Sequence, residues 1–180
     1  MVKKMTKWNY VEPFLFTRDA LHLQDISRQV GENHTTVRNI LNAFAQEGFL
    51  KMSQKGRLTL YEINSEFSLL IDYLSVAEKE FLIKKTKNPL LKELISDLHK
   101  LTDQPLLLFG STVIDFSKAR DIDILCLEKI EITSLEKKYR KKIHFLRVNN
   151  LKEIQLPLKQ EIQKKHIIVS SVEQVVKWLL

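Results

Sequence analysis

Two aspartates separated by one residue, Asp121 and Asp123, are the residues of this sequence best suited to chemistry. They open the run DIDILCL, residues 121–127, whose apolar residues predict a strand. Residues i and i+2 of a strand point to the same side, so both carboxylates would face one site. Such a pair can hold Mg²⁺, which prefers oxygen ligands and shares its coordination shell with substrate phosphates. The alternative is a pair of surface acids at the edge of a sheet.

A glycine-serine pair, Gly110 and Ser111, follows the apolar run 106–109, which is typical of a buried strand. A turn of this kind between a strand and a helix presents backbone N–H groups and a hydroxyl to phosphate. Together with the two aspartates, it predicts a site for Mg²⁺ and ATP or another nucleoside triphosphate. A metal-assisted attack on the α-phosphate is the chemistry that such a site would support.

The stretch LLLFGSTVIDFSKARDIDILCL, residues 106–127, resembles the minimal nucleotidyltransferase domain of the DNA polymerase β superfamily. That domain is found in the antitoxin partners of HEPN toxins, and the resemblance covers about residues 90–180. It implies a triphosphate held by Gly110 and Ser111. It also implies that Asp121 and Asp123 are catalytic residues and bind Mg²⁺.

Two departures from that family bear on catalysis. The family's third carboxylate comes from a later strand, which here reads KKIHFLRV, and the expected position is filled by His144. Histidine is a poor Mg²⁺ ligand, because hard cations favour oxygen. In the segment STVIDFSKAR, the residues directly after the glycine-serine turn are also not the glycine and arginine that the family usually has there. A two-carboxylate site of this kind is expected to bind a nucleotide and a metal without turnover. His144 is expected to be an ordinary strand residue; the alternative is a metal ligand or a base.

A second group of polar residues lies on a helix predicted over residues 34–47, with Asn33 as N-cap and Gly48 as terminator. Its apolar residues recur at the spacing of one buried stripe, at Val37, Ile40, Leu41 and Phe44. The opposite face carries His34, Thr35, Thr36, Arg38, Asn39 and Asn42. Arginine can pair with guanine and asparagine with adenine, while threonine and the helix N-terminus suit phosphate. The pattern predicts a helix that reads DNA; the alternative is a small helical domain that binds protein.

The elements around this helix have the order of a winged helix-turn-helix. Helices are predicted over residues 9–17 and 23–30, with a turn at Gly31, and strands over 49–53 and 58–63. Residues 54–57 form a plausible hairpin tip, where Lys55 and Arg57 flank Gly56 and would touch a DNA groove or its backbone.

Residues 21–63 resemble winged helix-turn-helix transcription regulators of the MarR and ArsR type. The residues TTVRNIL and EGFL are the most specific parts of that resemblance. It implies a recognition helix over residues 34–47, and often a homodimer that reads two half-sites of double-stranded DNA.

The remainder predicts an α+β protein with three parts. Residues 1–65 form the winged helix-turn-helix, residues 66–103 a helical connector that could also support dimerisation, and residues 104–180 a small α/β domain with a mixed sheet. Strands are expected over 106–109, 121–127, 143–148 and 167–170, and helices over 112–116, 131–142, 158–165 and 171–180.

The net charge of +7 favours a polyanionic partner, although solubility alone would also explain it. The charge is uneven: residues 1–65 carry net +3, residues 66–128 net −3, and residues 129–165 net +7. No single surface is therefore expected to coat nucleic acid uniformly. The basic run Lys137, Lys138, Arg140, Lys141 and Lys142 predicts a solvated helix face; the alternative is a second phosphate-contacting patch.

The remaining composition argues for a cytoplasmic protein. No apolar stretch reaches the ~18 residues of a membrane span, and no apolar run follows the basic segment Met1–Trp8, so no signal peptide is expected. Cys126 is the only cysteine, which excludes an internal disulfide, and its apolar strand places it in the core.

The two modules together resemble a group of largely archaeal proteins that join a winged helix to a degenerate nucleotidyltransferase domain. The leading interpretation is a DNA-binding transcriptional regulator whose second domain senses a nucleotide or contacts a protein. One alternative is an active Mg²⁺-dependent nucleotidyltransferase that modifies protein or RNA, which would need a third acidic group from Glu128 or Glu153. The other alternative is an antitoxin-like partner of a HEPN-type toxin.

Overall fold

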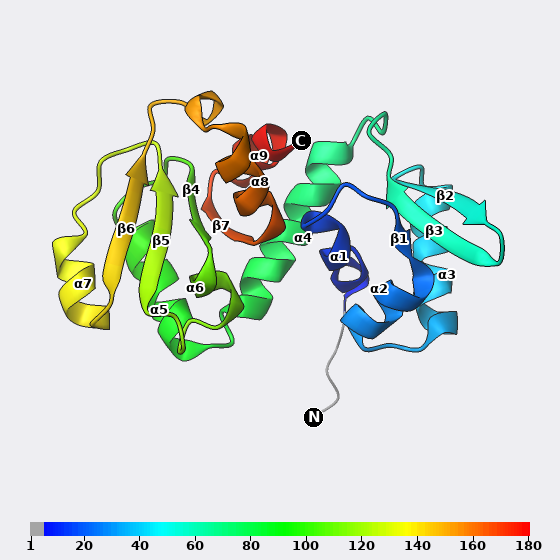
Figure 1. The fold of residues 1–180 in the computed structure, drawn as a ribbon, viewed down its shortest axis with the longest axis horizontal. Helices are drawn as coiled ribbons and strands as arrows, with labels where there is room; N and C mark the ends of the chain where they lie inside the picture. The colour runs from blue at the N-terminus through cyan, green and yellow to red at the C-terminus, as the bar shows by residue number, and fades with distance from the viewer. Residues whose placement is uncertain (1–5) are drawn as a thin grey trace. The chain divides into compact units, whose positions relative to one another are not determined.

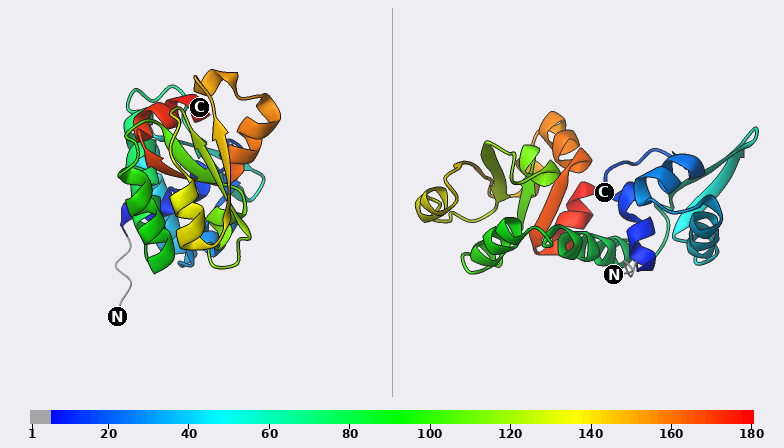
Figure 2. Two further views of the ribbon diagram at one scale, coloured as in Figure 1. Left: turned by 90° about the vertical axis from the view of Figure 1, so that its left-hand side faces the viewer. Right: turned by 90° about the horizontal axis from the view of Figure 1, so that it is seen from below.

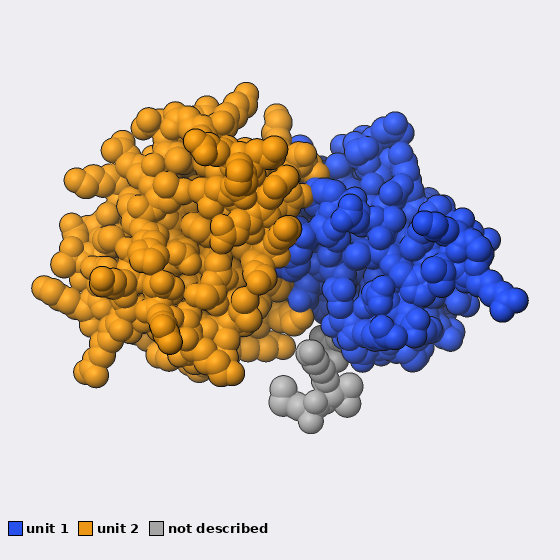
Figure 3. All heavy atoms as spheres, viewed as in Figure 1, with its two compact units in different colours: residues 1–80 blue, residues 81–180 orange. Residues whose placement is uncertain are grey.

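The computed structural model describes residues 6–180, so the first part of the basic segment Met1–Trp8 lies outside the described residues. The chain divides into two compact units, residues 1–80 and 81–180 (Figure 3). Along residues 6–180, no helix has both the length and the apolar character that crossing a membrane requires.

The N-terminal unit is built from short helices and a small sheet (Figure 1). In chain order its elements are η1 (Lys7–Tyr10), α1 (Glu12–Leu15), β1 (Leu21–His22), α2 (Leu23–Val30), α3 (His34–Gln46), β2 (Leu50–Lys55) and β3 (Leu58–Ile63). A longer helix, α4 (Leu70–Lys85), follows and continues past residue 80. The predicted helix over 23–30 is confirmed, and that over 34–47 is confirmed to within one residue. The single helix predicted over 9–17 is wrong, because a 3₁₀ turn and a short α-helix occupy that segment.

The sheet of this unit is antiparallel and has the order β1-β3-β2. The hairpin β2–β3 pairs from Leu50 with Ile63 to Lys55 with Leu58, so only Gly56 and Arg57 remain as its turn. A glycine with φ +62° at the first of two central positions is the solution of a type II′ hairpin. Two helices joined by a turn and followed by this hairpin make the arrangement of a winged helix-turn-helix.

An aromatic cluster holds the N-terminal unit together behind α3. Phe44 and Phe49 are fully buried and their ring centroids lie 5.5 Å apart. Trp8 stacks at 5.7 Å from Phe44, and Tyr73 at 5.1 Å from Phe49. Edge-on and tilted pairs of this kind are favourable beyond the apolar area they bury. The cluster therefore ties η1 and α4 to the back of α3.

The C-terminal unit is an α/β fold (Figure 1). Its elements after α4 are α5 (Pro89–His99), β4 (Leu106–Phe109), α6 (Ser111–Ile114), β5 (Asp121–Cys126), α7 (Thr133–Tyr139), β6 (Lys142–Arg147), η2 (Leu151–Glu153), α8 (Leu156–Lys164), β7 (His166–Ser170) and α9 (Val172–Leu179). The segment 66–103, expected to be helical throughout, contains α4 and α5 with a turn before the N-cap Asn88.

The second sheet is mixed, as predicted, with the order β6-β5-β4-β7. β4 runs antiparallel to both β5 and β7, while β5 and β6 are parallel. β4 and β7 are buried along their whole length, and Cys126 of β5 is fully buried, as expected. The helices α5 and α8 lie on opposite sides of this sheet (Figure 2). Within residues 6–180, no strand pairs with the outer edge of β6.

Candidate functional site

The start of α3 is fixed by its two flanking turns. Gly31 adopts φ +76° at the end of α2, where its N–H donates to the Ser27 carbonyl, and the chain reverses towards α3. The Asn33 side chain then accepts a hydrogen bond from the Thr36 backbone N–H at 2.9 Å. This cap satisfies a backbone donor that has no partner inside the helix. The two turns thus fix the residue at which α3 begins.

The two faces of α3 differ as the sequence predicts. Val37, Leu41 and Phe44 are buried against the unit, although Ile40, which was predicted to be buried, is only half-buried at the border between the two faces. On the opposite side the exposed residues are His34, Thr35, Arg38 and Asn39, and the half-buried residues are Thr36 and Asn42. Among residues 6–180, neither the Arg38 nor the Asn39 side chain has a hydrogen-bond or ion-pair partner.

Asn42 is positioned by a residue that the sequence did not single out. The hydroxyl of Tyr61, which is fully buried in β3, donates a hydrogen bond of 2.7 Å to Asn42 Oδ1. Burial raises the pKa of Tyr61, and the nearby charge of Arg38 opposes that rise. The hydroxyl therefore keeps its proton at neutral pH and remains a donor to Asn42.

The hairpin β2–β3 exposes its tip to solvent. Residues 51–58 are all exposed, including the predicted DNA contacts Lys55 and Arg57 and the apolar side chains of Met52 and Leu58. Within residues 6–180, the side chains of Lys55 and Arg57 make no hydrogen bond or ion pair. Two cations at a projecting tip are suited to phosphate oxygens.

In the C-terminal unit, the glycine-serine turn lies directly against the aspartate strand. Gly110 has φ +67° and ψ −143°, a region open to glycine alone, and a Cβ built on it would overlap Asp123 Oδ2. Ser111 Oγ donates to Asp121 Oδ1 at 3.4 Å. Thr112, which is fully buried, donates to the Asp121 backbone carbonyl at 3.1 Å and anchors the turn. Sequence reasoning did not identify Thr112.

His144 lies beside both aspartates. The parallel pairing of β5 and β6 sets Asp123 opposite His144, and its Nδ1 lies 3.1 Å from Asp123 Oδ1 and 3.8 Å from Asp121 Oδ2. The two carboxylates therefore face the same side of the sheet, next to Ser111. The position expected to carry a third carboxylate carries an imidazole that contacts the first two.

The structure brings to Asp121 and Asp123 neither of the two acids that could complete the predicted Mg²⁺ site. Glu128 accepts a hydrogen bond from Thr102 at 2.6 Å, and Glu153 accepts one from the Asn149 backbone at 3.3 Å, so neither joins the aspartates. Across residues 6–180, no group of three or more His, Cys, Asp or Glu side chains is arranged to hold a metal ion. A hard cation would have two carboxylates here and a nitrogen where it prefers oxygen.

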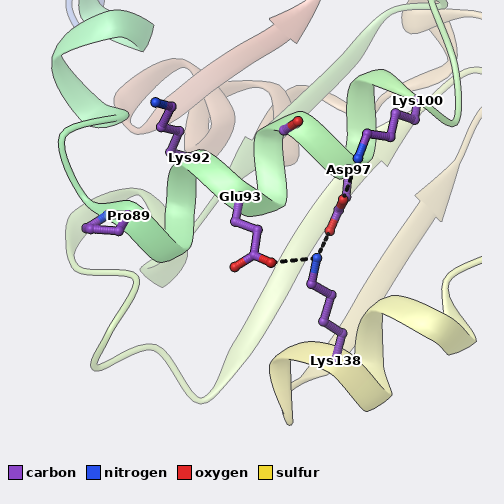
Figure 4. A pocket seen from close by; sticks show the side chains of 7 residues that line it. Pro89, Lys92, Glu93, Asp97, Lys100 and Lys138 are labelled. Atoms are coloured by element: carbon purple, nitrogen blue, oxygen red, sulfur yellow. Dashed lines mark hydrogen bonds and ion pairs between the residues drawn. The ribbon is translucent and has the colours of Figure 1, made fainter.

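A hollow of about 360 Å³ lies between α5 and Lys138 of α7 (Figure 4). Lys138 forms ion pairs with Glu93 at 2.7 Å and with Asp97 at 2.6 Å, and the Tyr139 hydroxyl donates to Asp97 at 2.7 Å. These hydrogen bonds, first from Lys138 and then from Tyr139, lower the pKa of Asp97 to about 2. Together with the ion pair of 3.3 Å between Lys100 and Asp97, these contacts join α5 to α7 beside the hollow through paired charges.

The comparisons with known proteins concern the N-terminal half. No protein-family model matches the chain, and no curated protein matches it. The structure of a complex of hsRosR-S1 is similar over 53% of this chain and 93% of its own, with 19% identity and a TM-score of 0.33. The PcaV transcriptional regulator from Streptomyces coelicolor, solved with its natural ligand, is similar over 55% of this chain and 77% of its own, with 16% identity and a TM-score of 0.35. Scores this low support no functional statement about the chain.

Proposed function

We propose that this protein is a transcriptional regulator that binds double-stranded DNA through α3 and the β2–β3 hairpin. The observation that carries the proposal is the largely exposed polar face of α3, which lies opposite the buried side chains of Val37, Leu41 and Phe44. Arg38 and Asn39 lie on that face, and within residues 6–180 neither of them is committed to a hydrogen bond or an ion pair. A side chain of this kind is available to base edges in the major groove.

The hairpin supplies the second contact. Lys55 and Arg57 neutralise phosphates beside the groove that α3 enters, and such contacts fix the position of a protein on DNA without reading its sequence. A second copy of the chain would read a second half-site, as symmetric regulators do. Because a dimer of this kind has two-fold symmetry, its DNA site should be palindromic.

The experiment is an affinity measurement on DNA selected from a random pool by the wild-type protein. We expect Arg38→Ala to weaken binding to the selected site by about 1–3 kcal/mol, because it removes a base contact. Arg147→Ala, which removes an exposed arginine of β6 in the other unit, is the matched control and should bind as the wild type does. Unchanged affinity of Arg38→Ala would show that α3 does not read the DNA.

For the C-terminal unit we propose a role without nucleotidyl transfer, as a surface that contacts a ligand or a partner protein such as a toxin. The support is the position of His144, whose ring contacts both aspartates where the family has a carboxylate. Without a cation, the carboxylates of Asp121 and Asp123 repel the phosphates of a nucleotide.

This second proposal is tested by incubating the protein with labelled ATP and Mg²⁺. We expect little or no label on the protein or on added RNA. Strong labelling that is lost in Asp121→Ala would contradict the proposal and establish an enzyme. A second protein of constant size that co-purifies with the full-length chain would favour the antitoxin-like role. It should still co-purify after α3 is mutated, because the contact would lie in residues 81–180.

A further inference from the structure

The contact between β3 and α3 bears on which bases the helix can read. Asn42 lies one helical turn after Arg38, on the same side of α3, and is half-buried. Its Oδ1 is directed inwards to the hydroxyl of Tyr61. Its Nδ2 has no hydrogen-bond partner among residues 6–180, so the amide offers its N–H donors to the outside.

An asparagine held in this way is poorly placed to pair with adenine in the usual manner, because its Oδ1 is turned towards Tyr61 and already accepts a hydrogen bond. That pairing needs Oδ1 to accept from the adenine N6 amino group while Nδ2 donates to N7. Here Oδ1 points into the protein, and only the donor half of the amide remains. Arg38 also carries donors alone. The two side chains therefore present a run of donors, and guanine, with acceptors at N7 and O6, is the base that complements donors best.

We infer that Tyr61 is a positioning residue that sets base preference: by holding Asn42 Oδ1, it makes this part of α3 select guanine and reject adenine. The inference rests on the proposed DNA-binding function and adds the base class that is read. It also assigns the choice to a buried residue of β3 that touches no DNA.

Two features make the arrangement a fixed one. Tyr61 is fully buried in β3, whose register with β2 places it opposite Met52 and whose pairing with β1 places it opposite Leu21. Burial and pairing on both sides therefore restrict the movement of its ring. The raised pKa of Tyr61 keeps the hydroxyl protonated, so it donates to Asn42 throughout the physiological range.

The test compares DNA selected from a random double-stranded pool by the wild type and by Tyr61→Phe. For the wild type we expect one position of the site to favour guanine over adenine by about tenfold or more. In Tyr61→Phe the amide of Asn42 is free to turn, and this preference should fall to about threefold or less. Tyr10→Phe removes a hydroxyl from another buried tyrosine of the same unit and should leave the selected site unchanged.

Two further variants separate a specificity role from a loss of folding. Asn42→Ala should lose the preference at the same position, and the double variant with Tyr61→Phe should lose no more than Asn42→Ala alone. If Tyr61→Phe selects the wild-type site with the wild-type preference, the inference is wrong while the proposed function stands. If the wild type enriches no sequence at all, the proposed function fails and the inference fails with it.

Discussion

The polar side chains on the exposed face of α3 are unpaired, whereas those of the acidic site in the C-terminal unit are paired within the fold. On α3, Arg38 and Asn39 project from a helix with a buried back, and within residues 6–180 they have no partner. In the other unit, Asp121 and Asp123 are contacted by Ser111 and His144. A polar group that the fold leaves unpaired in solvent is available for a ligand, whereas one that the fold has paired must first exchange that partner.

A specific sequence motif can therefore form as predicted while its side chains are already paired within the protein and not available to a ligand. The glycine-serine turn and the aspartate pair come together as their spacing predicts, yet the register of β5 and β6 brings a histidine against them. The residues of α3 form no motif of comparable specificity, but their surroundings leave them free. The functional assignment therefore follows the helix and not the acidic site.

The largest effect is expected where the buried side of α3, which supports its exposed polar face, loses a core side chain. Phe44→Ala removes a fully buried ring from the aromatic cluster, and the free energy of unfolding should fall by about 3–5 kcal/mol. Urea denaturation followed by tryptophan fluorescence measures it, because Trp8 contacts this ring. Met52→Ala, at an apolar residue of the same unit that is 52% exposed, is the control and should change stability by less than about 0.5 kcal/mol. A loss below about 1 kcal/mol in Phe44→Ala would mean that the cluster does not support the helix.

The next effect concerns the close contact inside the acidic site. Gly110→Ala places a Cβ against Asp123 and holds alanine in a backbone region that is unfavourable for it, so we expect a loss of about 3 kcal/mol. Gly56→Ala is the matched control: its φ is also positive, but nothing lies within 4 Å of the added carbon. That variant should lose about 1 kcal/mol. Thermal unfolding measures the loss of stability in both variants. Equal losses would show that the close approach of Gly110 to Asp123 leaves room for a Cβ.

The smallest effect concerns the pH dependence of the stability that the ion pairs of Asp97 provide. Asp97 has a pKa near 2 in the folded protein, below its ordinary value of 3.8, so its ion pairs stabilise the fold above about pH 4 and are lost as the pH falls towards 2. Asp97→Asn should therefore be less stable than the wild type at pH 7, by about 1 kcal/mol for a pair that is partly exposed. The difference should shrink between pH 4 and pH 2.

Lys138→Met supplies the control for this last prediction. It removes the main partner of Asp97, and adding Asp97→Asn to it should cost little more. Urea denaturation at a series of pH values measures both. A difference between wild type and Asp97→Asn that stays constant down to pH 2 would show that the carboxylate is not held by these pairs.

The sequence predicts those elements that local signals define. Asn33 and Gly48 mark the two ends of α3, and the apolar runs of the C-terminal unit give each of its strands to within a residue or two. The two-residue strand β1 is missed, because only its pairing with β3 makes it a strand. The cluster of Trp8 with Phe44 and Tyr73 is missed for the same reason, since it joins segments far apart along the chain.

In the candidate sites, too, local spacing could be predicted from the sequence and tertiary contacts could not. The spacing of Asp121 and Asp123 predicts that they share a face, and a strand register places His144 beside them. The partner of Asn42 could not be predicted, because Tyr61 lies 19 residues later and reaches it only through the fold of the hairpin. A residue type gives the chemistry that a side chain can do, and only tertiary structure gives the direction in which its donors and acceptors point.

Within residues 6–180 one edge of β6 is unpaired, and this strand carries a cation at each of its ends. An uncovered strand is a template for joining another chain edge to edge, and lysine or arginine on it is a natural defence. β6 begins at Lys142 and ends at Arg147, both exposed, so an antiparallel approach of two copies would set cation against cation at each end. The positive charges at the two ends of β6 therefore oppose the pairing of two copies through this edge.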